Sequence, residues 1–305
     1  MKYYDIIIIG AGVAGMNAAL NSIRGGKSVL IIEKNTYGGQ IASSPKVENF
    51  PSIESISGLE LSEKIFSQII DKGVDFELED VLELDKVDNL FTVKTDYNEY
   101  TCKACIIATG VKHKLINLPN ELNLVGKGIS YCAICDGAFY ENEDVCVVGD
   151  GNTAMQYALM LANTSKTVTI CTLFDKFFGE KVYEQRINEK ENIKVIQNVA
   201  LTKIIGTNKL DALEFTNLKT NEQLTIKPKG LFIAIGNIPD NKRFENLVKL
   251  DKEGYIQTND KLETETEGLF AIGDCRKKDV RQITTAVSDG SIASFYALNH
   301  LEKVK

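Results

Sequence analysis

The strongest constraint on the fold is a glycine-rich turn that occurs twice, each time directly after a short apolar run. Residues 10–15 read GAGVAG and follow four isoleucines, and residues 149–154 read GDGNTA and follow the apolar residues 145–148. A pattern typical of a helix comes next in both cases, at residues 13–25 and 153–163. A buried strand, a tight turn and a helix are the beginning of a βαβ unit. The sequence therefore predicts an α/β protein with two Rossmann-like nucleotide-binding domains.

The rest of the chain continues this pattern. Further apolar runs lie at residues 231–235 and 269–272, each directly before a glycine, and at residues 104–108, before Thr109-Gly110. The two βαβ units span residues 4–33 and 144–171, and 305 residues are enough for two hydrophobic cores. No low-complexity linker separates the units. We therefore expect the chain to cross between them at residues 110–119 and 236–244, each of which contains a proline.

Charge and hydropathy exclude several classes of protein. The formal net charge is −7, with no long basic run, which argues against a nucleic-acid partner. No apolar stretch approaches the roughly 18 residues that a membrane-spanning helix needs. The four isoleucines near the N-terminus are too short a run for a secretion signal, so we expect a cytoplasmic protein. Seven cysteines in that compartment indicate catalysis, metal binding or core packing rather than a disulfide scaffold.

The first glycine turn has the features of a dinucleotide site. Gly10 allows the tight turn, Gly12 lets a pyrophosphate approach the backbone, and Gly15 lets the helix pack on the strand. The next predicted strand, residues 27–32, ends at Glu33, which lies 18 residues after Gly15. An acidic residue about 20 residues beyond such a turn binds a ribose hydroxyl in dinucleotide-binding folds. This spacing predicts dinucleotide binding, whereas the alternative is a purely structural turn.

The second glycine turn lacks this recognition chemistry. Thr172 occupies the position that Glu33 holds in the first module, and threonine does not replace a carboxylate on ribose. Asp150 places a negative charge where a pyrophosphate would bind, which is unfavourable at short range. The only cations nearby are Lys176 and Lys181. The pattern favours a module kept as a scaffold over a functional NAD(P)H site.

The segment CAICD, which begins at Cys132, carries the strongest chemical signal. Cysteines three residues apart at the start of a helix can form a small reducible ring, and a helix N-terminus lowers a thiol pKa. Asp136 follows Cys135 directly, and the segment contains no histidine, so Asp136 is the predicted acid–base residue. The alternatives are metal binding or buried free thiols.

The other cysteines carry weaker signals. Cys102 and Cys105 begin an apolar strand, where residues an odd number apart face opposite sides and lie roughly 10 Å apart, too far for a disulfide. We predict that they are free thiols, and this placement also disfavours a zinc ribbon built from both pairs. Cys146 and Cys171 are predicted core residues of strands, and Cys275 receives no role.

Several motifs together resemble one family, the low-molecular-weight thioredoxin reductases, along nearly the whole chain. They are residues 10–15, Gly38-Gly39-Gln40, Val47-Glu48-Asn49-Phe50-Pro51, Ala108-Thr109-Gly110, residues 132–137, Gly273-Asp274 and Arg281-Gln282. The resemblance implies an FAD-binding domain at residues 1–113 and 244–305. The inserted domain, residues 114–243, resembles an NAD(P)H domain and carries the CxxC motif.

The resemblance also implies the site. Cys135 would face the flavin of FAD, Cys132 would attack thioredoxin, and Asp136 would relay a proton. A homodimer is implied, as is a swing of one domain about the two crossings. No metal is expected. The implied FAD-binding residues are Gly10, Gly12, Val13, Ala14, Gly15, Glu33, Lys34, Gly39, Gln40, Asn49, Thr109, Gly110, Gly273, Asp274, Arg281, Gln282 and Ile283.

The chain departs from the family's NADPH-binding pattern. Members that use NADPH carry His-Arg-Arg and a further arginine, where this chain has Thr172-Leu173-Phe174 and Phe178. A Gly-His-x-Pro segment reads Gly236-Asn237-Ile238-Pro239 here. The chain is more similar in this respect to the ferredoxin-dependent flavin thioredoxin reductases, which take single electrons from reduced ferredoxin.

We therefore predict a flavoprotein that reduces thioredoxin through the Cys132–Cys135 pair, with ferredoxin as its donor. An acidic ferredoxin needs a basic face, and Arg276-Lys277-Lys278 is a weak candidate for one; the alternative is a solvated loop. The first alternative is an NADPH-dependent thioredoxin-disulfide reductase. The others are an enzyme similar to ferredoxin–NADP reductase and a non-catalytic flavin-binding interaction protein.

Overall fold

The computed structural model describes residues 2–44 and 47–304. The chain forms two compact units, of which the first comprises residues 1–112 and 238–305 and the second residues 113–237. These divisions fall inside the two predicted crossings. The second division lies six residues before the bound expected from sequence, because Asn241 and Phe244 already belong to the first unit: Phe244 is fully buried in its core, and Asn241 hydrogen-bonds to Cys275.

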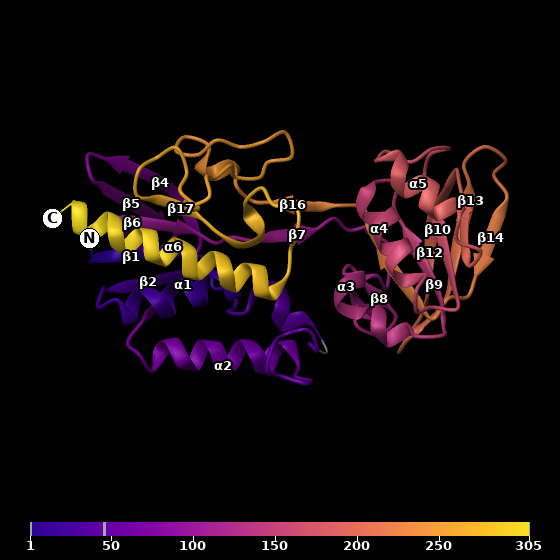
Figure 1. Ribbon diagram of the computed structural model, residues 1–305, viewed down its shortest axis with the longest axis horizontal. Helices are drawn as coiled ribbons and strands as arrows, with labels where there is room; N and C mark the ends of the chain where they lie inside the picture. The colour runs from indigo at the N-terminus through magenta and orange to yellow at the C-terminus, as the bar shows by residue number, and fades with distance from the viewer. Residues whose placement is uncertain (1, 45–46, 305) are drawn as a thin grey trace. The chain divides into compact units, whose positions relative to one another are not determined.

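The first unit is built on a seven-stranded sheet with the order β3-β2-β1-β6-β5-β4, in which β17 also pairs with β6 (Figure 1). The pairs β3–β2, β2–β1, β1–β6 and β6–β17 are parallel, whereas β4–β5 and β5–β6 are antiparallel. The strands are β1 (Lys2–Ile9), β2 (Val29–Glu33), β3 (Asp75–Leu78), β4 (Val81–Val87), β5 (Leu90–Thr95), β6 (Glu99–Ile107) and β17 (Leu269–Ala271).

Both faces of this sheet are buried, which accounts for the unbroken run of isoleucines in β1. Ile6 and Ile8 pack on one face with residues of α1 (Val13–Arg24) and α6 (Ile283–Lys303). Ile7 and Ile9 pack on the other face with residues of β4, β5 and the segment after η4 (Lys242–Phe244). The first unit also contains α2 (Gly58–Ile70), η1 (Gly39–Ser43) and η5 (Gly273–Cys275).

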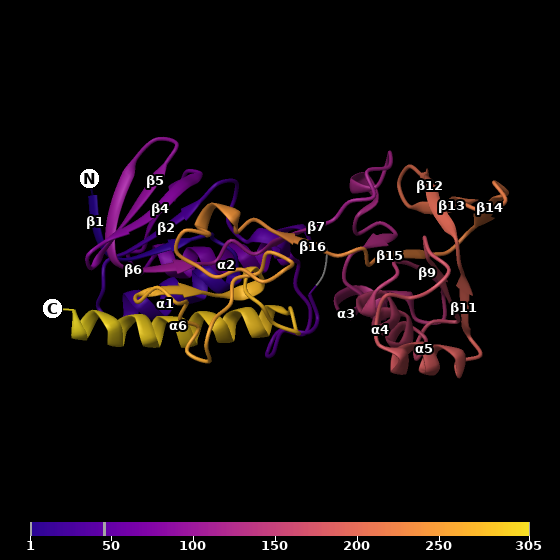
Figure 2. The ribbon, with the colours of Figure 1, turned by 90° about the horizontal axis from the view of Figure 1, so that it is seen from above.

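The second unit has a five-stranded parallel sheet with the order β11-β10-β9-β15-β8. One face packs on α4 (Asn152–Leu161) and α5 (Lys181–Asn188), and the other packs on a three-stranded antiparallel sheet (Figure 2). The parallel strands are β8 (Ile129–Ser130), β9 (Asp144–Val148), β10 (Thr167–Cys171), β11 (Ile193–Ile196) and β15 (Gly230–Ile233). The antiparallel strands are β12 (Val199–Gly206), β13 (Leu210–Asn217) and β14 (Gln223–Ile226).

Short elements complete the second unit and the crossings. They are η2 (Leu122–Leu124), α3 (Ala133–Asp136), η3 (Gly137–Tyr140) and the paired crossing strands β7 (Val111–His113) and β16 (Asn237–Pro239). The α/β fold with two Rossmann-like sheets is confirmed. Among the residues that the structure describes, no helix has both the length and the apolar character needed to cross a bilayer.

The prediction for Cys102 and Cys105 is correct in one part and wrong in another. Both are free thiols, but they pack in the same core cluster instead of on opposite faces. The alternation of side chains along β6 is offset near Lys103, and β1 shows the same offset beside it, since Tyr4 and Ile7 also share that face. Strand periodicity therefore fails at one position in two neighbouring strands.

Cys146 and Cys171 are buried core residues, as predicted. Their sulfur atoms lie 3.9 Å apart in the layer between the parallel and antiparallel sheets. Both thiols are free.

Candidate active site

The first glycine turn joins β1 to α1 and is packed where the sequence requires glycine. A Cβ atom on Gly10 would lie 2.4 Å from the carbonyl oxygen of Ala108, and Gly10 has a φ of +111°. A Cβ atom on Gly15 would lie 2.0 Å from the carbonyl oxygen of Gly10. A Cβ atom on Gly12, by contrast, would meet no other atom of the described residues within 4 Å, so the backbone of the turn is open to a ligand there.

Glu33 lies at the end of β2, beside this turn. Its Oε2 atom accepts a hydrogen bond from the backbone N–H of Ala11 at 2.8 Å, and Oε1 accepts one from Asn35 at 3.1 Å. The carboxylate is therefore fixed next to the glycine turn, with acceptor capacity left for a ribose hydroxyl.

Two buried polar atoms near the start of α6 have no protein partner within the described chain. They are Oδ1 of Asp274 and Nε of Arg281, whose guanidinium lies 4.4 Å from the ring centre of Tyr255. Burial raises the pKa of Asp274. Buried polar groups are nearly always hydrogen-bonded in folded proteins, so an unpaired acceptor and donor here fit a polar ligand. Together with the open turn and Glu33, these residues fit FAD.

A buried carboxylate holds the turn that contains Asp274. Asp289 on α6 accepts hydrogen bonds from the backbone N–H of Gly273 at 2.9 Å and from Arg276 at 2.8 and 2.9 Å. The Lys278 ammonium lies 3.0 Å from the same carboxylate, and its side chain is only 7% exposed. Burial alone would raise the pKa of Asp289, but the hydrogen bonds from Arg276 and the two positive charges outweigh it and lower that pKa.

This arrangement corrects one expectation from the sequence. The segment Arg276-Lys277-Lys278 is not a basic docking face, because Arg276 and Lys278 are turned inward onto Asp289. Only Lys277 of the three is exposed. The counter-charge is Asp289 on α6, and the sequence around residues 276–278 does not indicate this contact.

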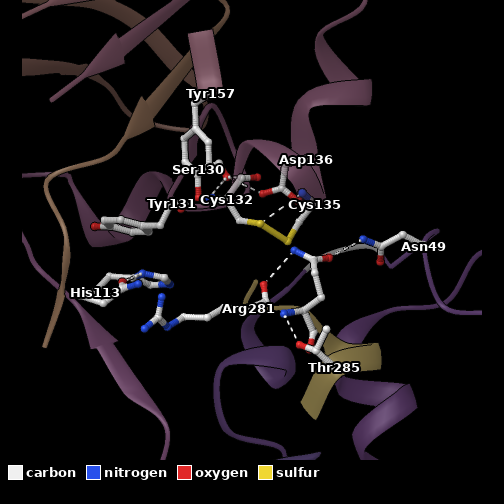
Figure 3. Close-up of a disulfide and its surroundings, with 12 residues drawn as sticks. Asn49, His113, Ser130, Tyr131, Cys132, Cys135, Asp136, Tyr157, Arg281 and Thr285 are labelled. Carbon is white, nitrogen blue, oxygen red and sulfur yellow. Dashed lines mark hydrogen bonds between the residues drawn. A yellow bond between two sulfur atoms is a disulfide. The ribbon is translucent and has the colours of Figure 1, made fainter. Parts of the chain in front are cut away.

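The other predicted FAD residues all lie in the first unit, and several are already engaged with protein groups. The amide of Asn49, which Figure 3 labels, donates to Gln282 at 3.1 Å. Thr109 donates to Asn241 at 3.2 Å, and Lys34 forms an ion pair with Asp240 at 2.9 Å. Gln40 donates to the carbonyl of Val111, Gly39 and Gly110 have positive φ, and Val13, Ala14 and Ile283 contribute to the core beside the turn.

The second unit contains the CxxC segment, where Cys132 and Cys135 form a disulfide (Figure 3). Cys132 is the residue before α3, and its sulfur accepts a hydrogen bond from the backbone N–H of Cys135 at 3.2 Å. Cys135 is exposed and Cys132 is half-buried. A surface disulfide at the start of a helix is open to attack by an external thiolate.

Asp136 lies directly beside the disulfide. Burial raises the pKa of its carboxyl, and the hydrogen bond from Ser130 opposes that rise. The Ser130 hydroxyl donates to Oδ2 of Asp136 at 2.6 Å, while Oδ1 is buried without a partner in the described chain. A carboxyl with a raised pKa next to two sulfur atoms is suited to donate and accept protons.

The second glycine turn is closed by its own chain. The Asp150 carboxylate accepts a hydrogen bond from the backbone N–H of Phe174 at 3.2 Å, and its carbonyl accepts one from Phe178 at 2.7 Å. Asn152 accepts another from the backbone of Glu180 at 2.8 Å. Thr172 is fully buried and donates to the carbonyl of Phe174 at 2.7 Å.

Comparison with known proteins identifies the family. A family model described as pyridine nucleotide-disulphide oxidoreductase matches residues 4–290. The chain belongs to this family. It is 40% identical to a thioredoxin reductase of Bacillus subtilis (strain 168), covering 100% of this chain and 96% of that protein. It is 37% identical to a Clostridium pasteurianum protein described as a 34.2 kDa protein in the rubredoxin operon, covering 98% of each.

Among solved structures, this pyridine nucleotide-disulphide oxidoreductase is similar to the thioredoxin reductase of Streptococcus pyogenes MGAS5005. The TM-score is 0.95 at 36% identity, and the match covers 99% of both chains. The likeness spans both units, in agreement with the long family match.

Sequence reasoning missed three polar residues that organise the oxidoreductase site. Asp289 and Asn241 connect segments far apart in the chain, and Ser130 reaches Asp136 only because β8 ends beside α3. The sequence gives a weak indication of Asp289, because it is the one acidic residue between Ile283 and Leu301 of α6. The other residues of that stretch are uncharged, apart from His300. The sequence gives no indication of Ser130 or Asn241.

Proposed function

We propose that this protein is a flavoprotein disulfide reductase that reduces thioredoxin through the Cys132–Cys135 disulfide, with reduced ferredoxin as its electron donor. The observation that carries the disulfide chemistry is a surface disulfide whose neighbouring acid, Asp136, is partly buried and hydrogen-bonded. It occurs in a chain that belongs to the pyridine nucleotide-disulphide oxidoreductases and is 40% identical over its full length to a protein named thioredoxin reductase.

FAD, when bound, accepts electrons singly or in pairs and delivers two of them to a disulfide. We propose that the open turn at Gly12 and the N-terminus of α1 receive its pyrophosphate. Glu33 would bind a ribose hydroxyl, and Asp274 and Arg281 would pair with polar groups of the cofactor. The other predicted FAD residues are proposed as contacts in the same unit.

The thiol steps follow from the positions of the two sulfurs. Two electrons and two protons convert the disulfide into the Cys132 and Cys135 thiols. The Cys132 thiolate then attacks the thioredoxin disulfide, a mixed disulfide forms, and the leaving sulfur takes a proton. The Cys135 thiolate attacks Cys132, which releases reduced thioredoxin and restores the disulfide. Asp136 is proposed to exchange the protons.

The donor assignment rests on the second glycine turn. Asp150 accepts hydrogen bonds from the backbone N–H groups of Phe174 and Phe178 across the turn, and the residue at the ribose position, Thr172, is buried. The exposed side chains in the loop at residues 173–180 include Leu173, Phe174 and Phe178, which cannot bind a phosphate, and one cation, Lys176, in place of the arginines of NADPH-dependent members. A one-electron carrier that bypasses this module explains these features better than NADPH does.

Two further properties are proposed from the same family resemblance. The protein is expected to act in the cytoplasm as a homodimer. The inserted domain is expected to swing about the two crossings, so that the disulfide meets the flavin and thioredoxin in turn.

The donor is tested by anaerobic reduction of the purified yellow protein. We expect reduced ferredoxin to bleach the flavin absorbance rapidly, with four ferredoxins oxidised per flavin at full bleaching because the Cys132–Cys135 disulfide also takes up two electrons, while NADPH and NADH bleach it slowly. Rapid bleaching by NADPH with tight binding would overturn the ferredoxin assignment and establish the NADPH-dependent alternative. If the flavin that ferredoxin has reduced goes on to reduce NADP⁺, an enzyme similar to ferredoxin–NADP reductase would be favoured instead.

The disulfide chemistry is tested with Cys135→Ser. This variant should keep its flavin and lose thioredoxin reduction, because the mixed disulfide at Cys132 has no thiol to resolve it. Cys146→Ala, which removes a buried free thiol of the same unit, is the matched control and should retain turnover. Full activity in Cys135→Ser would refute the mechanism, and absence of any transfer to thioredoxin in the unaltered protein would favour a non-catalytic flavin-binding role.

A further inference from the structure

The hydroxyl of Ser130 connects the acid to the attacking cysteine. Its oxygen accepts a hydrogen bond from the backbone N–H of Cys132 at 3.0 Å and donates its proton to Oδ2 of Asp136 at 2.6 Å, as Figure 3 shows. The carbonyl of Cys132 lies farther from that hydroxyl, at 3.3 Å. Ser130 is only 3% exposed, so water does not compete freely for these bonds.

The two oxygens of Asp136 are therefore not equivalent. Oδ2 accepts the Ser130 hydroxyl, and Oδ1 is buried without a hydrogen-bond partner within the described chain. A carboxyl that must carry a proton does so on the oxygen that is not already accepting a strong hydrogen bond, since the bonded oxygen holds the negative charge better.

We propose that Ser130 is a positioning residue that anchors Oδ2 of Asp136 and thereby directs the exchangeable proton to Oδ1. The inference rests on the disulfide-reductase function proposed above. In the step concerned, the Cys132 thiolate forms a new S–S bond with one sulfur of the substrate disulfide, and the old S–S bond breaks. The proton on Oδ1 of Asp136 passes to the leaving sulfur, and Asp136 becomes a carboxylate.

The groups that face Asp136 come from three neighbouring elements. Tyr140 on η3 and Tyr157 on α4 both feel its charge, and the two sulfurs of Cys132 and Cys135 lie at the start of α3. Burial raises the pKa of Tyr140 to about 12 and also raises that of Tyr157, so both phenols stay neutral near pH 7. Asp136 is consequently the carboxyl whose titration governs proton delivery.

The direction of the effect of Ser130 can be worked out. Its hydrogen bond favours the Asp136 carboxylate and so opposes the rise that burial causes in the pKa of Asp136. Loss of the hydroxyl should raise that pKa further. The range in which Asp136 can donate a proton should then extend to higher pH, while loss of the anchor should lower the maximal rate.

The test is a single-turnover reaction of the dithionite-reduced holoenzyme with hydroxyethyl disulfide, followed across pH. In Ser130→Ala we expect the limb of the pH–rate profile that reflects the titration of Asp136 to move up by about one pH unit. The plateau rate should fall several-fold. Ser130→Thr, which keeps a hydroxyl, should restore the position of the limb. Ser165→Ala removes another buried serine hydroxyl of this unit, one without a hydrogen-bond partner in the described chain, and should leave the profile unchanged.

A double variant separates positioning from a general structural effect. In an Asp136→Asn background, Ser130→Ala should cause no further shift, because the titrating group is already absent. The inference would be overturned if Ser130→Ala left the pH–rate profile unshifted. It would also be overturned if Ser130→Ala caused an equal shift in the Asp136→Asn background. Because the probe is a small disulfide and the reductant is dithionite, this result does not depend on thioredoxin or ferredoxin being the natural partners. A protein with no reactive dithiol would instead fail already in the unaltered form.

Discussion

The two glycine turns share a backbone pattern but present opposite surroundings. In the first, the backbone of the turn is open to a ligand at Gly12. Glu33, the last residue of β2, accepts a hydrogen bond from the backbone of the turn at Ala11. In the second, the acid lies inside the turn at Asp150 and binds the backbone of the following loop. The motif therefore specifies a strand–turn–helix shape, and the residues after the second strand decide whether a dinucleotide can use it.

The comparison extends to how the charges are arranged. In the first unit, the cluster of Asp289, Arg276 and Lys278 anchors the turn at Gly273–Cys275 and leaves Oδ1 of Asp274 unpaired. In the second unit, the loop after β10 presents exposed Phe174 and Phe178, stacked edge to face. A ligand site and a scaffold can thus be distinguished by which polar atoms remain unpaired.

The largest expected effect comes from removing the buried charge of the first unit. Asp289→Asn leaves Arg276 and Lys278 without their counter-charge and should lower the free energy of unfolding of the first unit by about 3–5 kcal/mol. Chemical denaturation at neutral pH measures this loss. Asp279→Asn, a nearby exposed position, should change stability little, and an equally stable Asp289→Asn would show that the cluster does not hold the turn.

The same residue gives a pH dependence of known sign. Because the pKa of Asp289 is lowered in the folded state, its stabilisation is present above the ordinary value of about 3.9 and is lost as pH falls through the lowered value. Stability in Asp289→Asn should lack this acid-dependent component.

A smaller effect is expected from replacing Glu33 of the first module with threonine, the residue type that the second module has at the equivalent position, Thr172. Glu33→Thr removes a charged acceptor for ribose, which is worth about 1.5–3 kcal/mol, and should weaken FAD binding by about 10–100-fold. The flavin-to-protein ratio after dialysis and fluorescence titration of the apoprotein measure it. Glu63→Thr on the exposed side of α2 is the control, and undiminished binding in Glu33→Thr would remove the main distinction between the modules.

The smallest effect concerns the closed turn. Asp150→Ala removes the hydrogen bond to Phe174 and should destabilise the second unit by about 1 kcal/mol, seen as earlier thermal unfolding and faster proteolysis at residues 173–180. NADPH should still bleach the flavin only slowly, since no phosphate-binding cation is gained. Asp211→Ala, at an exposed site of β13, is the control. Rapid reduction by NADPH in Asp150→Ala would mean that closure by the loop was the main barrier to that donor.

The contrast between the modules could be predicted from sequence wherever it depends on local spacing. Glu33, Thr172 and the glycines are placed by the period of a βαβ unit, and the disulfide is placed by the CxxC spacing. The anchoring of the turn that contains Asp274 could not be predicted, because Asp289 reaches the backbone of Gly273 from another element. The same carboxylate turns Arg276 and Lys278 inward. The shared face of Cys102 and Cys105 depends on an irregularity in strand alternation that composition does not encode.

The burial of five cysteines has a practical consequence for measuring the redox state. Only Cys132 and Cys135 lie where a reagent can reach them, while the free thiols are all buried, and burial raises the pKa of Cys102, Cys146 and Cys275. Alkylation of the native protein should therefore count two thiols or none. Mass spectrometry of alkylated protein from cell extracts can then measure the fraction of molecules whose Cys132–Cys135 pair is reduced.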